Sequence, residues 1–503
     1  MDSRVQTAGI IVIGEEILKG HVHDINSHYL AKELWSLGVK VKKISVVGDD
    51  VDDISQEVKI FSHLYDYVLT SGGIGPTHDD VTMAGIAKAF DEVLTTNPDM
   101  LKVLTKDGVR DEENIWLRMA IVPSSAVFCP QTLTLCPLVR IHNVYPFAGM
   151  PSALRSTFQY HKQLFASKEK SAGFFLKEVF FLVEEDNLAV PLNVLQNEFK
   201  DSVQVGSYPI DDMNSSVRVK VSLEGSDISI IEKCYCSLLL KMGPQLIQSV
   251  QNSWKNKDEV KLRESLKWLE TELVFHRLHL APMSLLIRIN ETIETLKVAL
   301  DKFGLDGLCI AFTGGKDCTV LLPLYQAVIK SKGLSYEQLK TLYVSPKNSF
   351  TEVEEFIGQT IKKYKLDLIR IEGTIQEALG SLKVTHPSIN AIIMGTRSTD
   401  PYSDNLKTFS STDANWPQYT RIHCILDWTY SQVWVFLRLF EIPYCQLYDK
   451  GYTSLGNSTD TKPNPALSME AIQTDAVCNG ISDYQPAYCL FDETLERAGR
   501  SKN

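Results

Sequence analysis

The chain of 503 residues is longer than one hydrophobic core usually supports, so its length predicts more than one domain. Hydrophobic residues make up 44% and charged residues 22%, the composition of an ordinary globular protein. A formal net charge of -11 argues against a nucleic-acid partner, which needs a basic surface. No apolar segment approaches the ~20 residues that cross a bilayer, and the N-terminus lacks a signal-sequence pattern. We therefore expect a cytoplasmic protein with no membrane partner.

Strands and helices alternate through the first part of the chain. Apolar runs predict strands at 9–13, 39–46 and 67–70, and amphipathic patterns predict helices at 25–37 and 81–90. Because parallel strands are joined by helical crossovers, this order predicts a parallel sheet covered by helices on both faces.

A glycine-rich loop follows the strand at 67–70, at the edge where open α/β sheets bind ligands. Its glycines suit a nest of backbone amides around an anion, and the nearby carboxylates suit a divalent metal that activates water. The candidate residues of this N-terminal site are Gly72, Gly73, Gly75, Asp50, Asp79 and Asp80. In an alternative interpretation Asp79 only caps the next helix and the domain is inactive.

A smaller unit begins after a polar stretch near residue 168. Its pattern of strands and helices indicates an α+β module, and the highly charged connector 251–262 is the predicted main boundary. The predicted elements are strands at 174–183, 203–208 and 217–223 and helices at 187–199, 263–275 and 284–303.

Around Thr313 the sequence predicts a buried strand, a tight turn and a helix start in direct succession. Gly314 and Gly315 allow the turn with no side chain between the backbone amides and an incoming anion. The helix beginning near Lys316 adds its positive dipole end, Lys316 adds a full charge, and Asp317 offers an oxygen suited to Mg²⁺. The spacing differs from the common mononucleotide loop, because only Thr313 precedes the glycine pair. This loop predicts a nucleoside triphosphate ligand.

The same loop resembles the pyrophosphate loop of the adenine-nucleotide α-hydrolase class, which includes PAPS reductases and eukaryotic FAD synthases. Further segments that match the FAD synthase pattern in order lie at 395–401, 425–434, 451–456 and 495–500. The resemblance covers about residues 285–503. It implies a PAPS reductase-like domain that transfers the adenylyl group of ATP to FMN, giving FAD and pyrophosphate.

The resemblance also implies roles for individual residues, because this transfer depends on positioning the phosphates and stabilising their charge. The catalytic candidates are Lys316, Asp317, Asp427 and Arg497, with Asp317 as the metal ligand. The candidates for binding ATP and FMN are Thr313, Gly314, Gly315, Arg397, Ser398, Asp400, Trp428 and Arg500. Thr313 stands where many FAD synthases carry Asn. The open alternatives are a helix N-cap for Asp427, a core position for Trp428, a surface salt bridge for Arg397 and a solvated chain end for Arg497 and Arg500.

The first half of the chain resembles the molybdopterin-binding domain family. Segments 12–18, 47–50, 72–80 and 147–151 carry this resemblance, and competence-damage-type proteins join such a domain to a small second module. In animal FAD synthases of this architecture the domain is associated with hydrolysis of FAD to FMN and AMP. The resemblance therefore implies a second activity, with another divalent metal.

Together these features predict two parallel-sheet α/β domains, one molybdopterin-binding-like and one adenine-nucleotide α-hydrolase-like, joined by a small α+β module and a helical linker. The predicted boundaries are 5–168, 172–252, 253–284 and 285–503. The predicted ligands are FMN, ATP and Mg²⁺. The predicted protein partners are a second copy of the chain and, transiently, apo-flavoproteins.

Two other functions remain open from the sequence. Sulfonucleotide reduction needs a nucleophilic cysteine near the C-terminus, but segment 495–500 has none, and Cys478 and Cys489 lack a basic setting. A non-catalytic protein that binds flavin or pterin would keep the loops without turnover. Formation of FAD from FMN and ATP would distinguish the three.

Overall fold

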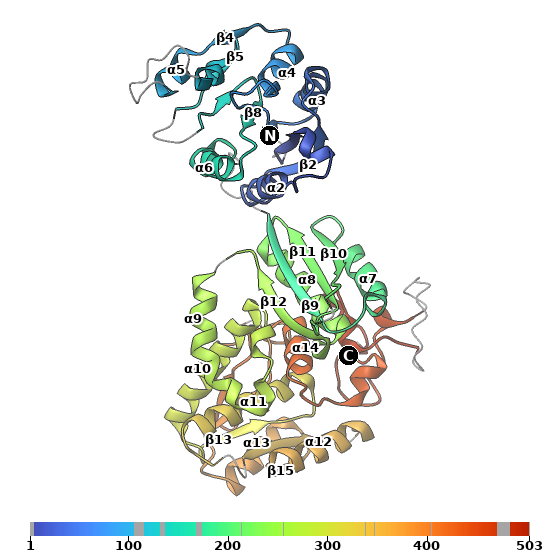
Figure 1. Ribbon diagram of the computed structural model, residues 1–503. Helices are drawn as coiled ribbons and strands as arrows, with labels where there is room; N and C mark the ends of the chain where they lie inside the picture. Colours follow the sequence, from blue (N-terminus) through green and yellow to red (C-terminus); the bar gives the residue numbers. More distant parts are fainter. Residues whose placement is uncertain are drawn as a thin grey trace. The chain divides into compact units, whose positions relative to one another are not determined.

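The computed structural model describes residues 5–104, 115–130, 136–166 and 174–501, apart from 213, 255, 336, 338, 347, 404 and 470–482. The chain folds into two compact units, Met1–Phe174 and Phe175–Asn503 (Figure 1). The predicted boundary at 168–172 lies outside the described residues.

The first unit contains a four-stranded parallel sheet in the order β2-β1-β3-β8. Successive side chains of a strand point to opposite faces, so β1 serves two cores. Ile10 packs with residues of α2 and α6 on one face, and Ile11 packs with residues of α3 and α4 on the other. The sheet and its helices are β1 (Thr7–Ile13), α1 (Glu15–Leu18), α2 (Asn26–Ser36), β2 (Lys40–Val47), α3 (Val51–Leu64), β3 (Tyr67–Ser71), α4 (Thr82–Ala89), α5 (Pro98–Leu104), β8 (Val144–Phe147) and α6 (Pro151–His161). Two short antiparallel pairs join β4 (Leu94–Thr96) to β5 (Ile121–Pro123) and β6 (Val127–Phe128) to β7 (Val139–Arg140).

The second unit begins with a four-stranded antiparallel sheet in the order β10-β11-β9-β12. This sheet and its two helices form the predicted α+β module. Its elements are β9 (Phe175–Phe181), α7 (Ala189–Phe199), β10 (Val203–Pro209), β11 (Val219–Gly225), α8 (Ile228–Met242) and β12 (Ile247–Asn252).

A six-stranded sheet in the order β15-β14-β13-β16-β18-β17 forms the rest of this unit, parallel except for β17. Ile310 of β13 faces a core shared with α10, α11, α12 and α14, whereas Cys309 faces α13. The elements are α9 (Lys257–Leu266), α10 (Met283–Phe303), β13 (Leu308–Ala311), α11 (Lys316–Ser331), β14 (Lys340–Ser345), α12 (Thr351–Tyr364), β15 (Asp367–Glu372), α13 (Ile375–Thr385), β16 (Ala391–Met394), β17 (Phe409–Ser411), β18 (Thr420–His423) and α14 (Tyr430–Leu439). Helices on both faces confirm the predicted α/β fold class.

The connector 251–262 does not separate two cores. A single cluster of buried hydrophobic residues runs from the α+β module into the large sheet's helices, and the Tyr235 hydroxyl of α8 donates to the Leu280 carbonyl at 2.8 Å. The main division of the chain therefore lies at Phe174, and the connector is an internal part of the second unit.

The predicted helix at 263–275 is wrong in its position. Asn256 caps a helix that starts at Lys257, because its side-chain oxygen accepts the amides of Asp258 and Glu259. That helix ends at Leu266, and the 3₁₀ turns η5 (Lys267–Thr271), η6 (Leu273–Phe275) and η7 (Leu278–Leu280) follow. No helix in the described part of the chain combines the length and apolar character needed to cross a membrane.

Candidate active site

The predicted phosphate loop lies at the point where the large sheet changes direction. The chain runs from β13 outward through β14 to β15, and then returns to the other side of β13 as β16. The loops after β13 and β16 therefore diverge, and such a switch point opens a crevice at the carboxyl edge of a parallel sheet. Gly314 follows β13 and Arg397 follows β16, so both candidates lie at this crevice.

The loop itself has the conformation that an anion cradle requires. Gly314 has φ of 75°, and a Cβ atom there would lie 3.1 Å from Val353 of α12, so the position favours glycine. The backbone amide of Gly314 has no hydrogen-bond partner among the described residues, and the Gly315 amide lies beside the Cys318 thiol, where it acts to lower the pKa of that thiol. They precede α11, whose N-terminal end carries the positive end of the helix dipole.

Two cations and two carboxylates form a buried cluster beside this loop. Lys316 Nζ lies 3.0 Å from Asp317 Oδ2 and 2.6 Å from Glu496 Oε1. Arg397 Nε lies 2.7 Å from Asp317 Oδ1, and Arg397 Nη2 donates to both oxygens of Glu496 at 2.6 Å. Lys316 is 2% exposed and Arg397 is 0% exposed, so the cluster is shielded from water.

The ion pairs determine the charges of this cluster. Burial alone would raise the pKa of Asp317, but Lys316 and Arg397 hold it below its ordinary value. Burial alone would lower the pKa of Arg397, but Asp317 and Glu496 raise it. Asp317 and Arg397 therefore both carry charge at neutral pH. Arg397 Nη1 is buried and has no hydrogen-bond partner among the described residues, which leaves a donor for a ligand.

The loop that carries Arg397 is held by its own polar groups. Asp400 Oδ2 accepts the Arg397 amide at 2.9 Å, and burial raises the pKa of this carboxyl. Gly395 packs so closely on α11 that a Cβ would lie 2.7 Å from the Cys318 amide nitrogen. Ser398 is exposed and its amide donates to the Leu426 carbonyl. Asp400 thus shapes the loop around Arg397.

The two C-terminal arginines differ in their surroundings. Arg497 is exposed. Arg500 is half-buried, with Nη2 3.6 Å from Asp460 Oδ1 and its guanidinium against Gly456, where a Cβ would lie 2.0 Å from Nη1. Arg497 is therefore the freer of the two to meet phosphate.

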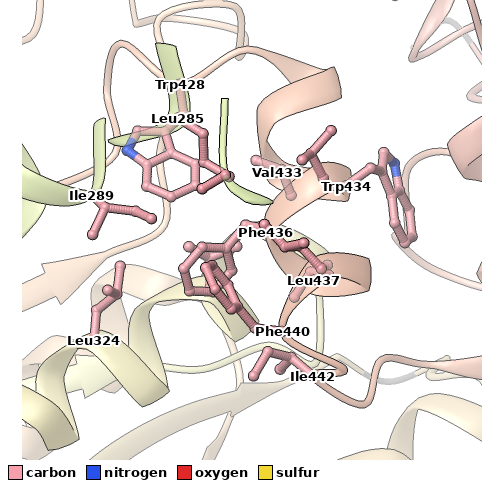
Figure 2. Close-up of a cluster of buried hydrophobic side chains, with 14 of the residues drawn as sticks. Leu285, Ile289, Leu324, Trp428, Val433, Trp434, Phe436, Leu437, Phe440 and Ile442 are labelled. Atoms are coloured by element: carbon pink, nitrogen blue, oxygen red, sulfur yellow. The ribbon is translucent and has the colours of Figure 1, made fainter. Parts of the chain in front are cut away.

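Trp428 does not face the site. Its ring is 2% exposed and packs with Phe436 in the hydrophobic core (Figure 2). Its Nε1 donates to Thr292 Oγ1 at 3.0 Å. The structure thus replaces the predicted flavin contact with the core position that was its alternative.

Asp427 has a side chain 71% exposed, with Oδ2 4.0 Å from Arg288, and it does not cap α14, because Thr429 does. Its catalytic role stays a prediction.

Two residues of the site were missed in the sequence. Glu496 neutralises Lys316 and Arg397, and the Tyr448 hydroxyl accepts the backbone amide of Lys316 at 2.9 Å. The only local indication for Glu496 was its place beside Arg497 in the C-terminal segment that matches FAD synthases. No local pattern indicates Tyr448, because its contact spans 132 residues.

A thiol-dependent reaction at the loop is not supported. Burial raises the pKa of Cys318, and its Sγ donates to the Gly315 carbonyl at 3.1 Å. Cys489 lies outside this loop, and Cys478 lies outside the described residues.

The described residues form no ready-made metal site. No group of three or more His, Cys, Asp or Glu side chains within the described ranges is arranged to hold an ion. The carboxylate of Asp317 is engaged by Lys316 and Arg397, which is not the setting of a free Mg²⁺ ligand.

The first unit has its own cavity of about 500 Å³, lined in part by Gly72, Gly73, Gly75, Asp79 and Asp80. The glycine loop thus lies where it was predicted. Gly72 and Gly73 have φ of 111° and 63°, which glycine adopts without strain.

The acidic residues of this loop differ from their predicted roles. Asp50 caps α3 by accepting the amides of Asp52 and Asp53, and Asp49 lines the cavity in its place. Asp80 accepts the Gly75 amide at 2.7 Å, so it occupies part of the predicted anion nest. The cap of α4 is Val81, so the alternative role of Asp79 as a cap is also wrong.

A glycine loop at the switch point of a parallel sheet is the arrangement with which many α/β proteins bind nucleotides, and the C-terminal part of this chain matches the PAPS reductase domain family. Family models match the chain in the same order. They are a probable molybdopterin binding domain over 9–166, an FAD synthase middle domain over 173–251, and a phosphoadenosine phosphosulfate reductase domain over 307–388 and 375–463.

Relatives match over the whole chain or over part of it. The chain is 34% identical to a probable FAD synthase of Caenorhabditis elegans over 99% of this chain and 97% of the relative. A probable FAD synthase of Schizosaccharomyces pombe is 37% identical over 44% of this chain and 84% of its own length. The solved structure of Candida glabrata FMN adenylyltransferase with FMN and the ATP analogue AMPCPP is 30% identical, with a TM-score of 0.41, and covers 48% of this chain and 98% of its own. The chain belongs to the FAD synthase family.

Proposed function

We propose that this chain is an FMN adenylyltransferase, which joins FMN and ATP to give FAD and pyrophosphate. The observation that carries this proposal is the glycine turn at Gly314 and Gly315 before α11, set at a sheet switch point in a chain of the FAD synthase family. The phosphate of FMN attacks the α-phosphorus of ATP in line, and pyrophosphate leaves.

Chain groups hold the charge that develops on the leaving pyrophosphate. The amides of Gly314 and Gly315 and the dipole end of α11 bind its oxygens. The exposed Thr313 hydroxyl and the free Nη1 donor of Arg397 add hydrogen bonds, and Arg497 supplies a mobile charge. None of these groups takes up a proton, so the chain contributes orientation and electrostatic stabilisation.

Magnesium enters as part of the substrate, MgATP. An ion brought in this way would need few protein ligands, which suits the described residues, because they contain no group of three or more His, Cys, Asp or Glu side chains arranged to hold it. Asp317 then acts mainly by holding Arg397 and Lys316.

Incubation of the full chain with FMN, ATP and Mg²⁺, followed by chromatography of the flavins, tests this function. We expect stoichiometric FAD and pyrophosphate, and a loss of at least about 100-fold for Asp317→Asn, which removes a charge from the cluster. Asp306→Asn is the matched control, because that side chain is 94% exposed. A wild-type chain that binds FMN and ATP without forming FAD would establish the non-catalytic alternative.

We propose a second activity, hydrolysis of FAD to FMN and AMP, for the first unit. The cavity of about 500 Å³ supports it, because it combines glycine amides with the carboxylates of Asp49 and Asp79. Carboxylates in the cavity repel the negative pyrophosphate of FAD, so this activity needs a divalent metal between them. Asp49 and Asp79 are the candidate ligands of this metal. Residues 1–174 form a compact unit, so this fragment is assayed for AMP release from FAD with and without divalent metals. Unchanged FAD under all conditions would contradict the proposal.

A cytoplasmic location, a homo-oligomer and transient contact with apo-flavoproteins complete the proposed function. Only the contact with apo-flavoproteins follows from a role in supplying FAD. Light scattering of the purified chain measures the oligomer, and imaging of a tagged chain measures its location. Faster flavinylation of an apo-flavoprotein by the chain than by free FAD would support direct contact.

A further inference from the structure

The side chain of Glu496 connects the C-terminal segment to the phosphate loop. It is carried by the residues after η11 (Glu493–Leu495), and it contacts Lys316 Nζ and Arg397 Nη2 at 2.6 Å each. Its two partners belong to α11 and to the loop after β16, about 180 and 99 residues earlier in the chain. This contact therefore joins three segments distant in sequence.

The main chain around Glu496 is fixed as well. Thr453 Oγ1 donates to the Glu496 carbonyl at 2.6 Å, and Asn464 Nδ2 donates to the Leu495 carbonyl at 2.7 Å. Asn464 is 0% exposed and Thr453 is 1% exposed, so both donor side chains are buried. Glu496 is held at both its carboxylate and its backbone, whereas the next residue, Arg497, is exposed.

The charges of the cluster cancel. Lys316 and Arg397 face Asp317 and Glu496, and all four lie within the same set of ion pairs. A neutral, shielded cluster offers little net attraction to the phosphates of ATP, because each cation is already paired. Besides the single free donor Nη1 of Arg397, the positive charge that this C-terminal segment leaves available to phosphate is that of the exposed Arg497.

From these contacts we infer that Glu496 is a positioning residue that docks the arginine-bearing C-terminal segment on the phosphate loop. Lys316 and Arg397 are its docking partners, so Lys316 acts through Glu496 and does not meet phosphate. The inference rests on the proposed synthase function, since it assigns the phosphate contact to Arg497. Loss of the Glu496 charge leaves two buried cations with one carboxylate and frees the segment.

The docking is tested first without activity. In the full chain, Glu496→Gln keeps the size of the side chain and removes its charge. We expect trypsin to cleave after Arg497 at least about tenfold faster than in the wild type, as mass spectrometry of the intact chain would show, because the segment opens more often. Glu355→Gln is the matched control, since Glu355 is exposed on α12 of the same unit. Equal cleavage of the wild type and Glu496→Gln would overturn the inference.

The role of Arg497 is tested by a double-mutant cycle on FAD formation. We expect kcat/KM for ATP to fall about 10–100-fold in Glu496→Gln and in Arg497→Ala, and no further in the double variant, because both act through one contact. Additive losses would overturn the inference. Should Glu496→Gln not fold, Glu496→Asp takes its place, since the shorter carboxylate cannot reach both cations, and the same two readouts apply. A wild-type chain that forms no FAD would instead refute the proposed function, leaving the proteolysis result to stand alone.

Discussion

At the scale of the residue, the buried side chain of Arg397 contributes to stability through its two ion pairs. Its guanidinium serves Asp317 and Glu496, and it is 0% exposed. Removing one partner of a buried ion network leaves uncompensated charge, so we expect Arg397→Met to lower the free energy of unfolding by about 3–5 kcal/mol. Urea denaturation of residues 175–503 measures it. Arg370→Met removes a half-exposed pair with Glu354 and should cost about 1 kcal/mol or less. Equal costs for the two variants would contradict this account of the cluster.

A substitution of Trp428 should change stability and leave activity unchanged. Trp428→Phe removes the hydrogen bond to Thr292 and some core volume, so unfolding should become easier by about 1–2 kcal/mol. The KM for FMN should not change, because the indole is buried among core side chains (Figure 2). Steady-state kinetics at varied FMN concentration check this. A KM that rises tenfold would return Trp428 to the flavin site.

His423 predicts a pH dependence of stability. Burial, with Arg421 nearby, lowers the pKa of this 2% exposed side chain to about 4, whereas the unfolded chain titrates near 6.5. The unfolded state therefore takes up the proton first. Stability from this group is complete above about pH 6.5 and falls by about 1.4 kcal/mol per pH unit between 6.5 and 4. Urea unfolding at pH 7, 6 and 5 should show this slope, and His423→Gln should flatten it. An equal slope in both chains would exclude His423 as its source.

Sequence reasoning at this scale succeeded where chemistry is local. The glycines before Lys316 require a turn whatever surrounds them, and their backbone has the predicted form. It failed where the role of a residue depends on its burial. The sequence around a tryptophan such as Trp428 does not show whether its ring faces a ligand or the core. The pairing of Glu496 with Lys316 spans 180 residues, and no local pattern encodes it.

At the scale of the element, the site depends on how closely the loop after β16 approaches α11. Gly395→Ala would place a Cβ 2.7 Å from the Cys318 nitrogen, and backbone on both sides cannot give way cheaply. We expect this variant to displace Arg397 and to lower kcat/KM by at least about tenfold. The matched control is Gly358→Ala in α12, where a Cβ meets nothing within 4 Å. That change should stabilise the chain by up to about 1 kcal/mol and leave kinetics unchanged. Full activity in Gly395→Ala would show that the close approach is dispensable.

The strands β13 to β16 of the large sheet are short and rich in apolar residues, and an amphipathic helix separates each from the next, which is the pattern that predicts a parallel α/β sheet, whereas no helix separates β17 and β18 from β16 or from each other. The error at 263–275 has a local cause, since the cap at Asn256 starts α9 early and 3₁₀ turns replace its predicted second half. Such turns have no periodic signature longer than a few residues.

At the scale of the whole molecule, the α+β module and the large sheet share one core, which composition could not reveal. Phe199 of α7 packs edge-on against Phe491 with ring centroids 5.8 Å apart, and α8 packs against α14. The module thus supports the same C-terminal stretch that carries Glu496. The charged connector at 251–262 was predicted as a boundary. Its charge indicates only that it is exposed to solvent, and an exposed segment need not mark the end of a core.

This shared core predicts which fragments fold. Residues 285–503 lack Phe275, whose ring packs with Phe436 and Phe440, and they also lack Leu278 and Leu280. Each large apolar side chain contributes about 1.5–3 kcal/mol on burial. Loss of these three side chains would therefore remove most of a typical free energy of unfolding of about 5–15 kcal/mol. We therefore expect residues 175–503 to unfold cooperatively and to form FAD, and residues 285–503 to aggregate or to melt without a cooperative transition. Circular dichroism melting and gel filtration compare the two, with residues 1–174 as a second fragment cut at the same natural division. A fragment 285–503 that melted as cooperatively as 175–503 would show that the module is merely attached to the synthase core and is not part of it.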